Sequence, residues 1–201
     1  MNEINKRYNE TIADVNEINR NVNWKLLSMR WGNTFNYGEE NSIEFDRLSG
    51  VTGILGANFS GKSSVVDTLL YILFNTTSKN ERKNLNIINQ NKDDCWGEIK
   101  IEIGNKIYKV KRTSIKYTKK LKGEETLEAK TDLDFEVYDR VTKETTSLNA
   151  ATRNQTDAVI RKHFGSIEDF FVSSMASQHG SLAFLEEGST KRKEIIAKFL
   201  D

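Results

Sequence analysis

A glycine-rich loop with a lysine and two serines is the part of this sequence whose residue types and spacing point to chemistry. The stretch GANFSGKSS, residues 56–64, places Gly56, Gly61, Lys62 and Ser63 at the spacing G-x-x-x-x-G-K-[ST]. In a phosphate loop, backbone N–H groups surround the β-phosphate, the lysine binds β- and γ-phosphate oxygens, and the serine hydroxyl binds Mg²⁺. The motif therefore predicts a nucleotide site.

Most of this loop is expected to contact the nucleotide. The expected contact residues are Asn58, Phe59, Ser60, Gly61, Lys62, Ser63 and Ser64. Lys62 is the expected catalytic residue and Ser63 the expected metal ligand. Phe59 is large for a position beside phosphates, where many related loops carry proline or glycine. We favour the interpretation in which its ring packs outside the loop.

The elements around the loop must position it. The apolar run VTGILG, residues 51–56, predicts a short buried strand. Residues 62–74 follow with apolar side chains at helical spacing, which predicts an amphipathic helix whose N-terminus faces the phosphates. Strand, glycine loop and helix in this order are the context in which the motif binds phosphate.

Alternating and helical hydrophobic patterns organise the remaining chain. We expect strands at 25–31, 42–46, 98–103, 106–114 and 133–139. We expect helices at 1–22, 151–164, 166–174 and 189–200. An Asn/Lys-rich connector covers 75–94 and a charged tip covers 116–131. The pattern predicts an α/β fold with an antiparallel hairpin subdomain and a helical C-terminal segment.

Composition excludes several classes of protein. Lys and Arg number 30 against 29 Asp and Glu, so net charge gives no indication of a nucleic-acid or membrane partner. No apolar run is long enough to span a bilayer, and the polar N-terminus is unlike a secretory signal. The single cysteine, Cys95, fits a reducing compartment. We expect a cytoplasmic protein that binds no membrane and has no Cys/His metal site.

Three segments together resemble a known family. They are GANFSGKSSVVDTLLYILF at the loop, GNTFNYGEENSIEF before it, and FGSIEDFFVSSMASQHGSLAFLEEGSTKRKEIIAKFLD at the end of the sequence. This combination resembles the SMC-like repair ATPases of the SbcC type. The resemblance implies the N-terminal lobe of an ABC-type P-loop head with a mixed sheet over 25–201, preceded by a polar helix over 1–24.

The resemblance also implies functional residues outside the loop. The family's first hairpin leans on the adenine and ribose of ATP, which implies contacts from Asn33, Thr34 and Asn36. Many members carry arginine where this sequence has Phe35, and Asn36 can equally be a turn residue. Gln178 matches the family's Q-loop glutamine, which completes the Mg²⁺ shell and approaches the attacking water. The alternative is that Gln178 is an ordinary polar loop residue.

The implied function is that of an ATPase half-head in DNA double-strand-break repair. No LSGG-like signature or strand ending in Asp-Glu occurs in the sequence, and family members carry these beyond a long coiled coil. The implied partners are therefore a C-terminal half, a second head in an ATP-dependent dimer, an SbcD-type nuclease and DNA. A chromosome-organising SMC clamp is the alternative, distinguished by a globular hinge instead of a zinc hook. A transporter subunit is disfavoured because Gln178 follows Lys62 at too great a distance.

A basic cluster accompanies the second alternating strand. Its members are Lys106, Lys109, Lys111, Arg112, Lys116, Lys119, Lys120 and Lys122. Such a cluster can bind DNA phosphates through counterion release. For any single lysine we favour an ordinary solvated face, because acidic residues follow at once, and we expect Tyr108 and Val110 to face the core.

Overall fold

The computed structural model describes residues 24–78, 84–121, 124–167, 169–170, 188–190, 192–193 and 197. The chain divides into two compact units, of which the larger is Trp24–Ile160, and the described part of the smaller begins at Arg161. The helix expected at 1–22 and the Q-loop residue Gln178 lie outside the described residues. Among the described residues, no helix is long and apolar enough to cross a membrane.

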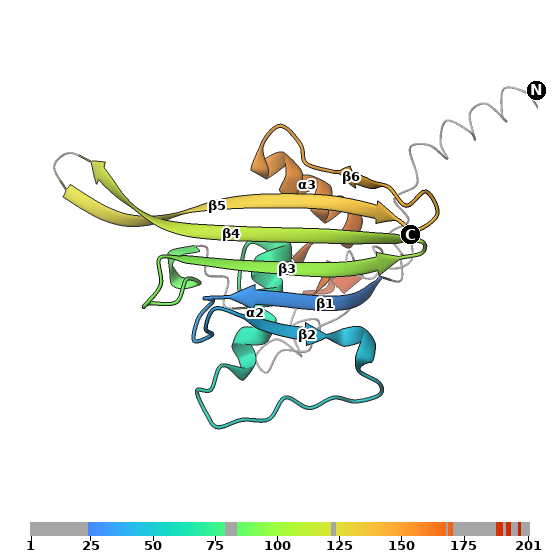
Figure 1. Ribbon diagram of the computed structural model, residues 1–201, viewed down its shortest axis with the longest axis horizontal. Coiled ribbons are helices and arrows are strands. Elements are labelled where there is room, and N and C mark those ends of the chain that lie inside the picture. The colour runs from blue at the N-terminus through green and yellow to red at the C-terminus, as the bar shows by residue number, and fades with distance from the viewer. Residues whose placement is uncertain are drawn as a thin grey trace, which may run out of the picture. The chain divides into compact units, whose positions relative to one another are not determined.

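A six-stranded sheet forms the framework of the larger unit (Figure 1). Its strands, in the order in which they lie side by side, are β2 (Asn41–Glu44), β1 (Lys25–Gly32), β3 (Asp94–Ile103), β4 (Lys106–Leu121), β5 (Glu124–Asp139) and β6 (Thr145–Ser147). Each neighbouring pair is antiparallel. The five strands expected at 25–31, 42–46, 98–103, 106–114 and 133–139 are confirmed, and the α/β class with them. The described sheet is wholly antiparallel, however, and not the mixed sheet that the resemblance implied. The short edge strand β6 was not predicted.

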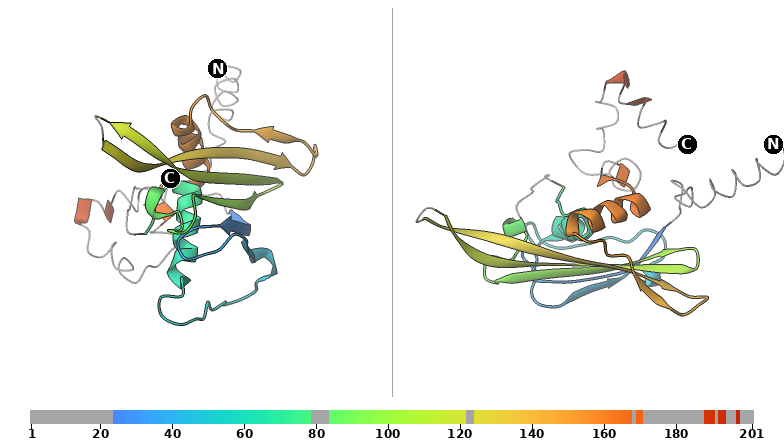
Figure 2. Two further views of the ribbon diagram at one scale, coloured as in Figure 1. Left: turned by 60° about the vertical axis from the view of Figure 1, so that its left-hand side comes forward. Right: turned by 90° about the horizontal axis from the view of Figure 1, so that it is seen from above.

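Helix α2 (Lys62–Phe74) covers one face of this sheet, with the bounds that its pattern predicted (Figure 2). The last turns of α2 are buried on every side, from Leu70 to Phe74. Ile72 lies directly on the backbone of β3, because a Cβ at Gly97 would stand 2.5 Å from Ile72 Cγ1. Only a residue without a side chain permits this approach, so Gly97 sets the distance between helix and sheet.

Segment 51–56 differs from its prediction. The expected buried strand is absent, and the described residues there form an extended, exposed loop in which Leu55 is 94% exposed. A strand needs a neighbouring strand to satisfy its backbone, and no described strand pairs with this segment. Leu48, Val51 and Ile54 are also exposed. The apolar pattern therefore did not produce a strand among the described residues.

The β4–β5 ribbon is longer than its sequence pattern predicted. The charged tip expected at 116–131 is largely strand, paired from Ile115 with Lys130 to Leu121 with Glu124. Ion pairs within the ribbon use much of its basic charge. They join Lys109 to Glu136, Lys119 to Glu128 and Lys120 to Glu125. This self-neutralisation supports the solvated-face interpretation of these lysines.

Helix α3 (Arg153–Phe164) ends as the sequence indicated, at Gly165, which has a φ of +81°. Two short 3₁₀ helices, η1 (Phe45–Arg47) and η2 (Asn84–Asn86), were not predicted. In the smaller unit, Ser166 N–H donates to Asp169 Oδ2 and Asp169 N–H donates to Ser166 Oγ, a reciprocal capping pair. The described residues of the expected helix 189–200 are helical.

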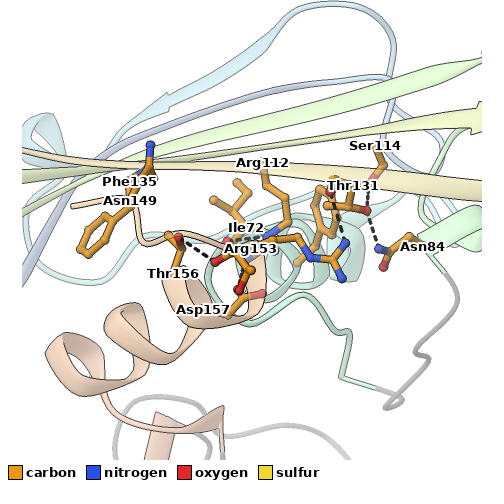
Figure 3. Close-up of polar contacts among 12 residues, drawn as sticks. Ile72, Asn84, Arg112, Ser114, Thr131, Phe135, Asn149, Arg153, Thr156 and Asp157 are labelled. Atoms are coloured by element: carbon orange, nitrogen blue, oxygen red, sulfur yellow. Dashed lines mark hydrogen bonds and ion pairs between the residues drawn. The ribbon is translucent and has the colours of Figure 1, made fainter. Parts of the chain in front are cut away.

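One member of the basic cluster, Arg112, is a core residue, which corrects its grouping with the surface lysines. Arg112 is 0% exposed. Its Nη2 donates to Asp157 Oδ1 of α3 at 2.7 Å, and its Nε donates to the Ile72 carbonyl of α2 at 3.0 Å (Figure 3). A strand position facing the core would normally be apolar. Here a buried ion pair links β4 to α3, and a hydrogen bond from the same side chain links β4 to α2.

Replacing Arg112 by methionine should lower the free energy of unfolding by about 3–5 kcal/mol, because the change leaves the buried Asp157 carboxylate and the Ile72 carbonyl without their donor. Urea denaturation measures this value. Lys111→Met is the matched control, since Lys111 is the exposed neighbour on the opposite face, and it should change stability by less than about 0.5 kcal/mol. Equal effects of the two substitutions would contradict the core role of Arg112.

Candidate nucleotide-binding site

The start of α2 presents unpaired backbone donors. Gly61 is the N-cap residue, with a φ of +90°, and no described side chain caps the helix there. The first turn carries no acidic residue. The first N–H groups of a helix have no partner inside it, and they carry the positive end of the helix dipole. The Lys62 and Ser63 amides therefore form an arrangement suited to an anion such as phosphate.

The Lys62 side chain folds back over the loop that precedes it. Its Nζ donates to the Gly56 carbonyl at 2.9 Å and to the Ala57 carbonyl at 2.6 Å. These contacts hold the ammonium group against the backbone at the start of the loop. Residues 56–63 therefore carry both a positive charge and uncapped backbone donors.

The other loop residues are exposed. Asn58, Ser60 and Ser63 lie at the surface, and Ser60 N–H donates to the Ala57 carbonyl at 3.3 Å. Ser64 N–H donates to the Gly61 carbonyl at 3.0 Å, and the Ser64 carbonyl accepts from Thr68 Oγ1. Ser64 thereby belongs to the first turn of the helix.

Phe59 has an unusual backbone conformation for an aromatic residue, with a φ of +64°. Its ring is 97% exposed. The ring therefore points away from the loop, and the space next to the loop backbone stays open to phosphates.

Ser63 has a hydroxyl oxygen of the kind that binds Mg²⁺, and its side chain is exposed. No group of three or more His, Cys, Asp or Glu that could hold a metal ion occurs among the described residues. Mg²⁺ in nucleotide sites takes few protein ligands and completes its shell with phosphates and water. The exposed Ser63 hydroxyl fits that requirement, and the second expected ligand, Gln178, lies outside the described residues.

The turn between β1 and β2 lies beside the loop, but two of its expected contact residues face inward. Thr34 is 0% exposed, and its Oγ1 pairs with Thr68 Oγ1 of α2 at 3.1 Å. Asn33 is buried and donates to Asp94 Oδ1 at 3.4 Å. Burial leaves the Thr34 side chain no surface for a nucleotide, so the predicted contacts of Asn33 and Thr34 would have to come from the backbone, and they stay predictions.

Two further residues of the turn, Asn36 and Tyr37, hold the loop directly. Asn36 Nδ2 donates to the Phe59 carbonyl at 3.4 Å, and the Tyr37 hydroxyl donates to the Gly61 carbonyl at 3.0 Å. Asn36 therefore contacts the loop backbone, and its two predicted roles, turn residue and nucleotide contact, both stay predictions. Sequence reasoning missed Tyr37, because its pairing with Gly61 joins residues 24 positions apart and has no local pattern.

A curated viral protein is similar over most of the chain. The sequence is 28% identical over 199 residues to the uncharacterized protein R555 of Acanthamoeba polyphaga mimivirus. The match covers 95% of this chain and 14% of that protein, so the chain spans about a seventh of the relative's length.

Two solved structures are also similar. One is a structure described under the structural biochemistry of ATP-driven dimerization and DNA-stimulated activation of SMC ATPases. It has 16% identity and a TM-score of 0.45, and the match covers 87% of this chain and 98% of that chain. The other is the recombination mediator protein RecF–ATP of the RecFOR pathway, with 16% identity and a TM-score of 0.39. The match covers 53% of this chain and 27% of that chain.

The family comparison covers the phosphate loop, the sheet and the C-terminal segment together. The family model described as AAA domain matches residues 29–201, which is most of the chain. The match includes Lys62, the uncapped start of α2 and the turn that holds the loop. The chain therefore belongs to the AAA domain family of ATPase domains.

Proposed function

We propose that this chain is the ATP-binding lobe of an SMC-like ATPase head of the SbcC type, acting in the cytoplasm in DNA double-strand-break processing with a nuclease partner. The observation that carries ATP binding is that one loop–helix junction, residues 56–63, carries both the uncapped start of α2 and the Lys62 ammonium, which is held by the Gly56 and Ala57 carbonyls. The motif resemblance along the chain supports the SbcC-type assignment, since GANFSGKSS, the first hairpin and the segment around Gln178 occur in the family's order.

Lys62 and the loop amides would hold the triphosphate of ATP. The Lys62 ammonium is already oriented by the Gly56 and Ala57 carbonyls, so it needs only a small movement to reach phosphate oxygens. A phosphate oxygen carries negative charge and a carbonyl oxygen does not, so Coulomb attraction to the ammonium favours this exchange of partners. Ser63 would bind Mg²⁺, which neutralises charge on the β- and γ-phosphates when it is bound.

The exposed apolar segment 48–55 supports the proposal of a C-terminal partner lobe. Leu48, Val51, Ile54 and Leu55 are all exposed on a segment whose sequence resembles a buried strand. Burying a Val, Leu or Ile side chain contributes about 1.5–3 kcal/mol. A strand of the C-terminal half, pairing with this segment, would satisfy its backbone and cover these side chains. That half would also bring the residues that polarise the attacking water.

The remaining partners follow from the proposed head. A second copy of the head would cover the ATP bound at the loop surface and so form an ATP-dependent dimer. DNA and an SbcD-type nuclease would bind this dimer. A chromosome-organising SMC clamp uses the same kind of head and remains the second candidate. The sequence between the two halves distinguishes them, because a Cys-x-x-Cys zinc hook indicates repair and a globular hinge indicates a clamp.

Lys62→Ala should abolish measurable ATP binding by the full-length protein and leave its folding intact. The lysine contributes charge to the ligand site and not to the core, and its loss should weaken binding by about a hundredfold or more. Isothermal calorimetry measures the affinity. Lys100→Ala, an exposed lysine of β3, is the control and should bind ATP as the wild type does. Unchanged affinity in Lys62→Ala would overturn the site.

The 201-residue chain alone should bind ATP weakly and should not hydrolyse it, whereas addition of the C-terminal half should restore hydrolysis. Leu55→Asp should prevent this restoration, because a carboxylate cannot be buried in the docked segment. Val141→Asp, another exposed apolar position on the larger unit, is the control. Pull-down and steady-state ATPase assays measure both steps. Steady hydrolysis by the chain alone would contradict the split-head proposal.

Gln178→Ala should leave ATP binding nearly unchanged while it lowers head dimerisation and ATP hydrolysis. The glutamine would offer one neutral contact to the Mg²⁺ shell, so its loss should cost only about 0.5–1.5 kcal/mol, or at most roughly tenfold in affinity. Head dimerisation and hydrolysis should fall much further, because Gln178 is the proposed contact that differs between open and closed heads. Wild-type dimerisation and turnover in this variant would identify Gln178 as a plain loop residue.

A further inference from the structure

The closest side-chain contact between the β1–β2 turn and the phosphate loop is made by Tyr37. Its hydroxyl donates to the Gly61 carbonyl at 3.0 Å. Its ring also lies over Gly61, since a Cβ added there would stand 3.5 Å from Tyr37 Cε2. The contact therefore falls on the last residue before α2, at the point where the loop becomes helix.

The Gly61 carbonyl shares a peptide plane with the Lys62 N–H. The described chain contains no cis peptide bond, so this peptide is trans, and its C=O and N–H point in opposite directions. A hydrogen bond that holds the carbonyl towards Tyr37 also holds the Lys62 N–H away from Tyr37. Gly61 has no Cβ and a φ of +90°, so its own backbone restricts this plane little, and its carbonyl is held by two donors, the Tyr37 hydroxyl and the Ser64 N–H, each at 3.0 Å.

Tyr37 is itself fixed by three contacts on the side away from the loop. Its ring meets Trp31 edge to face, with 5.3 Å between centroids. Its N–H donates to the Thr34 carbonyl at 2.9 Å, and its carbonyl accepts from Asn89 Nδ2 at 3.2 Å. Burial raises the pKa of Tyr37 above its ordinary value, so the hydroxyl keeps its proton and remains a donor at neutral pH.

We propose that Tyr37 is a positioning residue of the nucleotide site, whose hydroxyl sets the Gly61–Lys62 peptide so that the Lys62 N–H faces the phosphates. This inference rests on the proposed ATP-binding function. Tyr37 does not touch the nucleotide in this arrangement. It acts through the peptide plane, and its effect is confined to the polyphosphate part of the ligand.

Tyr37→Phe tests the inference in the full-length protein, because it removes the hydroxyl and keeps the ring against Trp31. The dissociation constants of ATP, ADP and inorganic tripolyphosphate with Mg²⁺ should all rise by a similar factor, roughly three- to tenfold. KM for ATP should rise by a larger factor than kcat falls, since the lost amide contact exists in both ground and transition states. Tyr138→Phe, an exposed tyrosine of β5, is the control with unchanged affinity.

Three results would overturn the inference. The first is wild-type affinity for all three ligands in Tyr37→Phe. The second is weaker binding of ATP and ADP with unchanged tripolyphosphate binding, because that pattern would make Tyr37 a base or ribose contact. The third is a wild-type backbone amide shift of Lys62 in Tyr37→Phe by NMR, which would show that the peptide does not depend on the hydroxyl.

The Lys62→Ala variant shows whether a negative result concerns only the positioning role of Tyr37 or the proposed ATP-binding function as well. If Lys62→Ala loses ATP and Tyr37→Phe binds as the wild type does, the site stands and the positioning role is wrong. If the wild-type protein binds none of the three ligands, the proposed function and the inference both fall.

Discussion

The approach of Ile72 to Gly97 is the contact on which the rest of the larger unit depends. The side chain of Ile72 rests on the β3 backbone, while its carbonyl accepts a hydrogen bond from the buried Arg112 of β4. One residue of α2 is thus held by two strands through two different kinds of contact. A helix is rigid, so the contact that fixes the end of α2 on the sheet also fixes the position of its N-terminus relative to the sheet. The phosphate loop lies at that beginning.

A second line of support reaches the loop from the sheet side. Lys116 of β4 donates to backbone carbonyls of residues 89, 90 and 92, which fastens this segment to the ribbon. Asn89 then hydrogen-bonds the β1–β2 turn through Asn33 and Tyr37. Tyr37 and Asn36 complete the connection to the loop. The chain of hydrogen bonds therefore holds the loop at Phe59 and Gly61, while packing against the sheet holds the helix that follows the loop.

The charges of the β4–β5 ribbon serve the protein itself to a large extent. Arg112 is buried against Asp157, and Lys116 binds backbone carbonyls. Lys119 and Lys120 pair with glutamates of β5. Side chains used in this way have less charge available for phosphates of DNA. A count of basic residues along a strand does not show which of them are already paired within the protein, because their partners lie on other elements, up to 45 residues away.

The sequence by itself determined the features whose causes are local. The loop motif, the helix 62–74 and the alternating strands follow from the spacing of neighbouring residues, so their residue types were sufficient to predict them. Gly61 and Lys62 were identified as site residues for the same reason.

Only the tertiary structure decided the features that depend on distant partners. Segment 51–56 has the composition of a strand, but no described strand pairs with it. Arg112 sits in a run of basic residues, yet it points inward to Asp157. Tyr37 gains its position beside Gly61 only when the turn folds onto the loop. In each case the deciding interaction joins residues far apart in sequence, and a local pattern carries no information about such a partner.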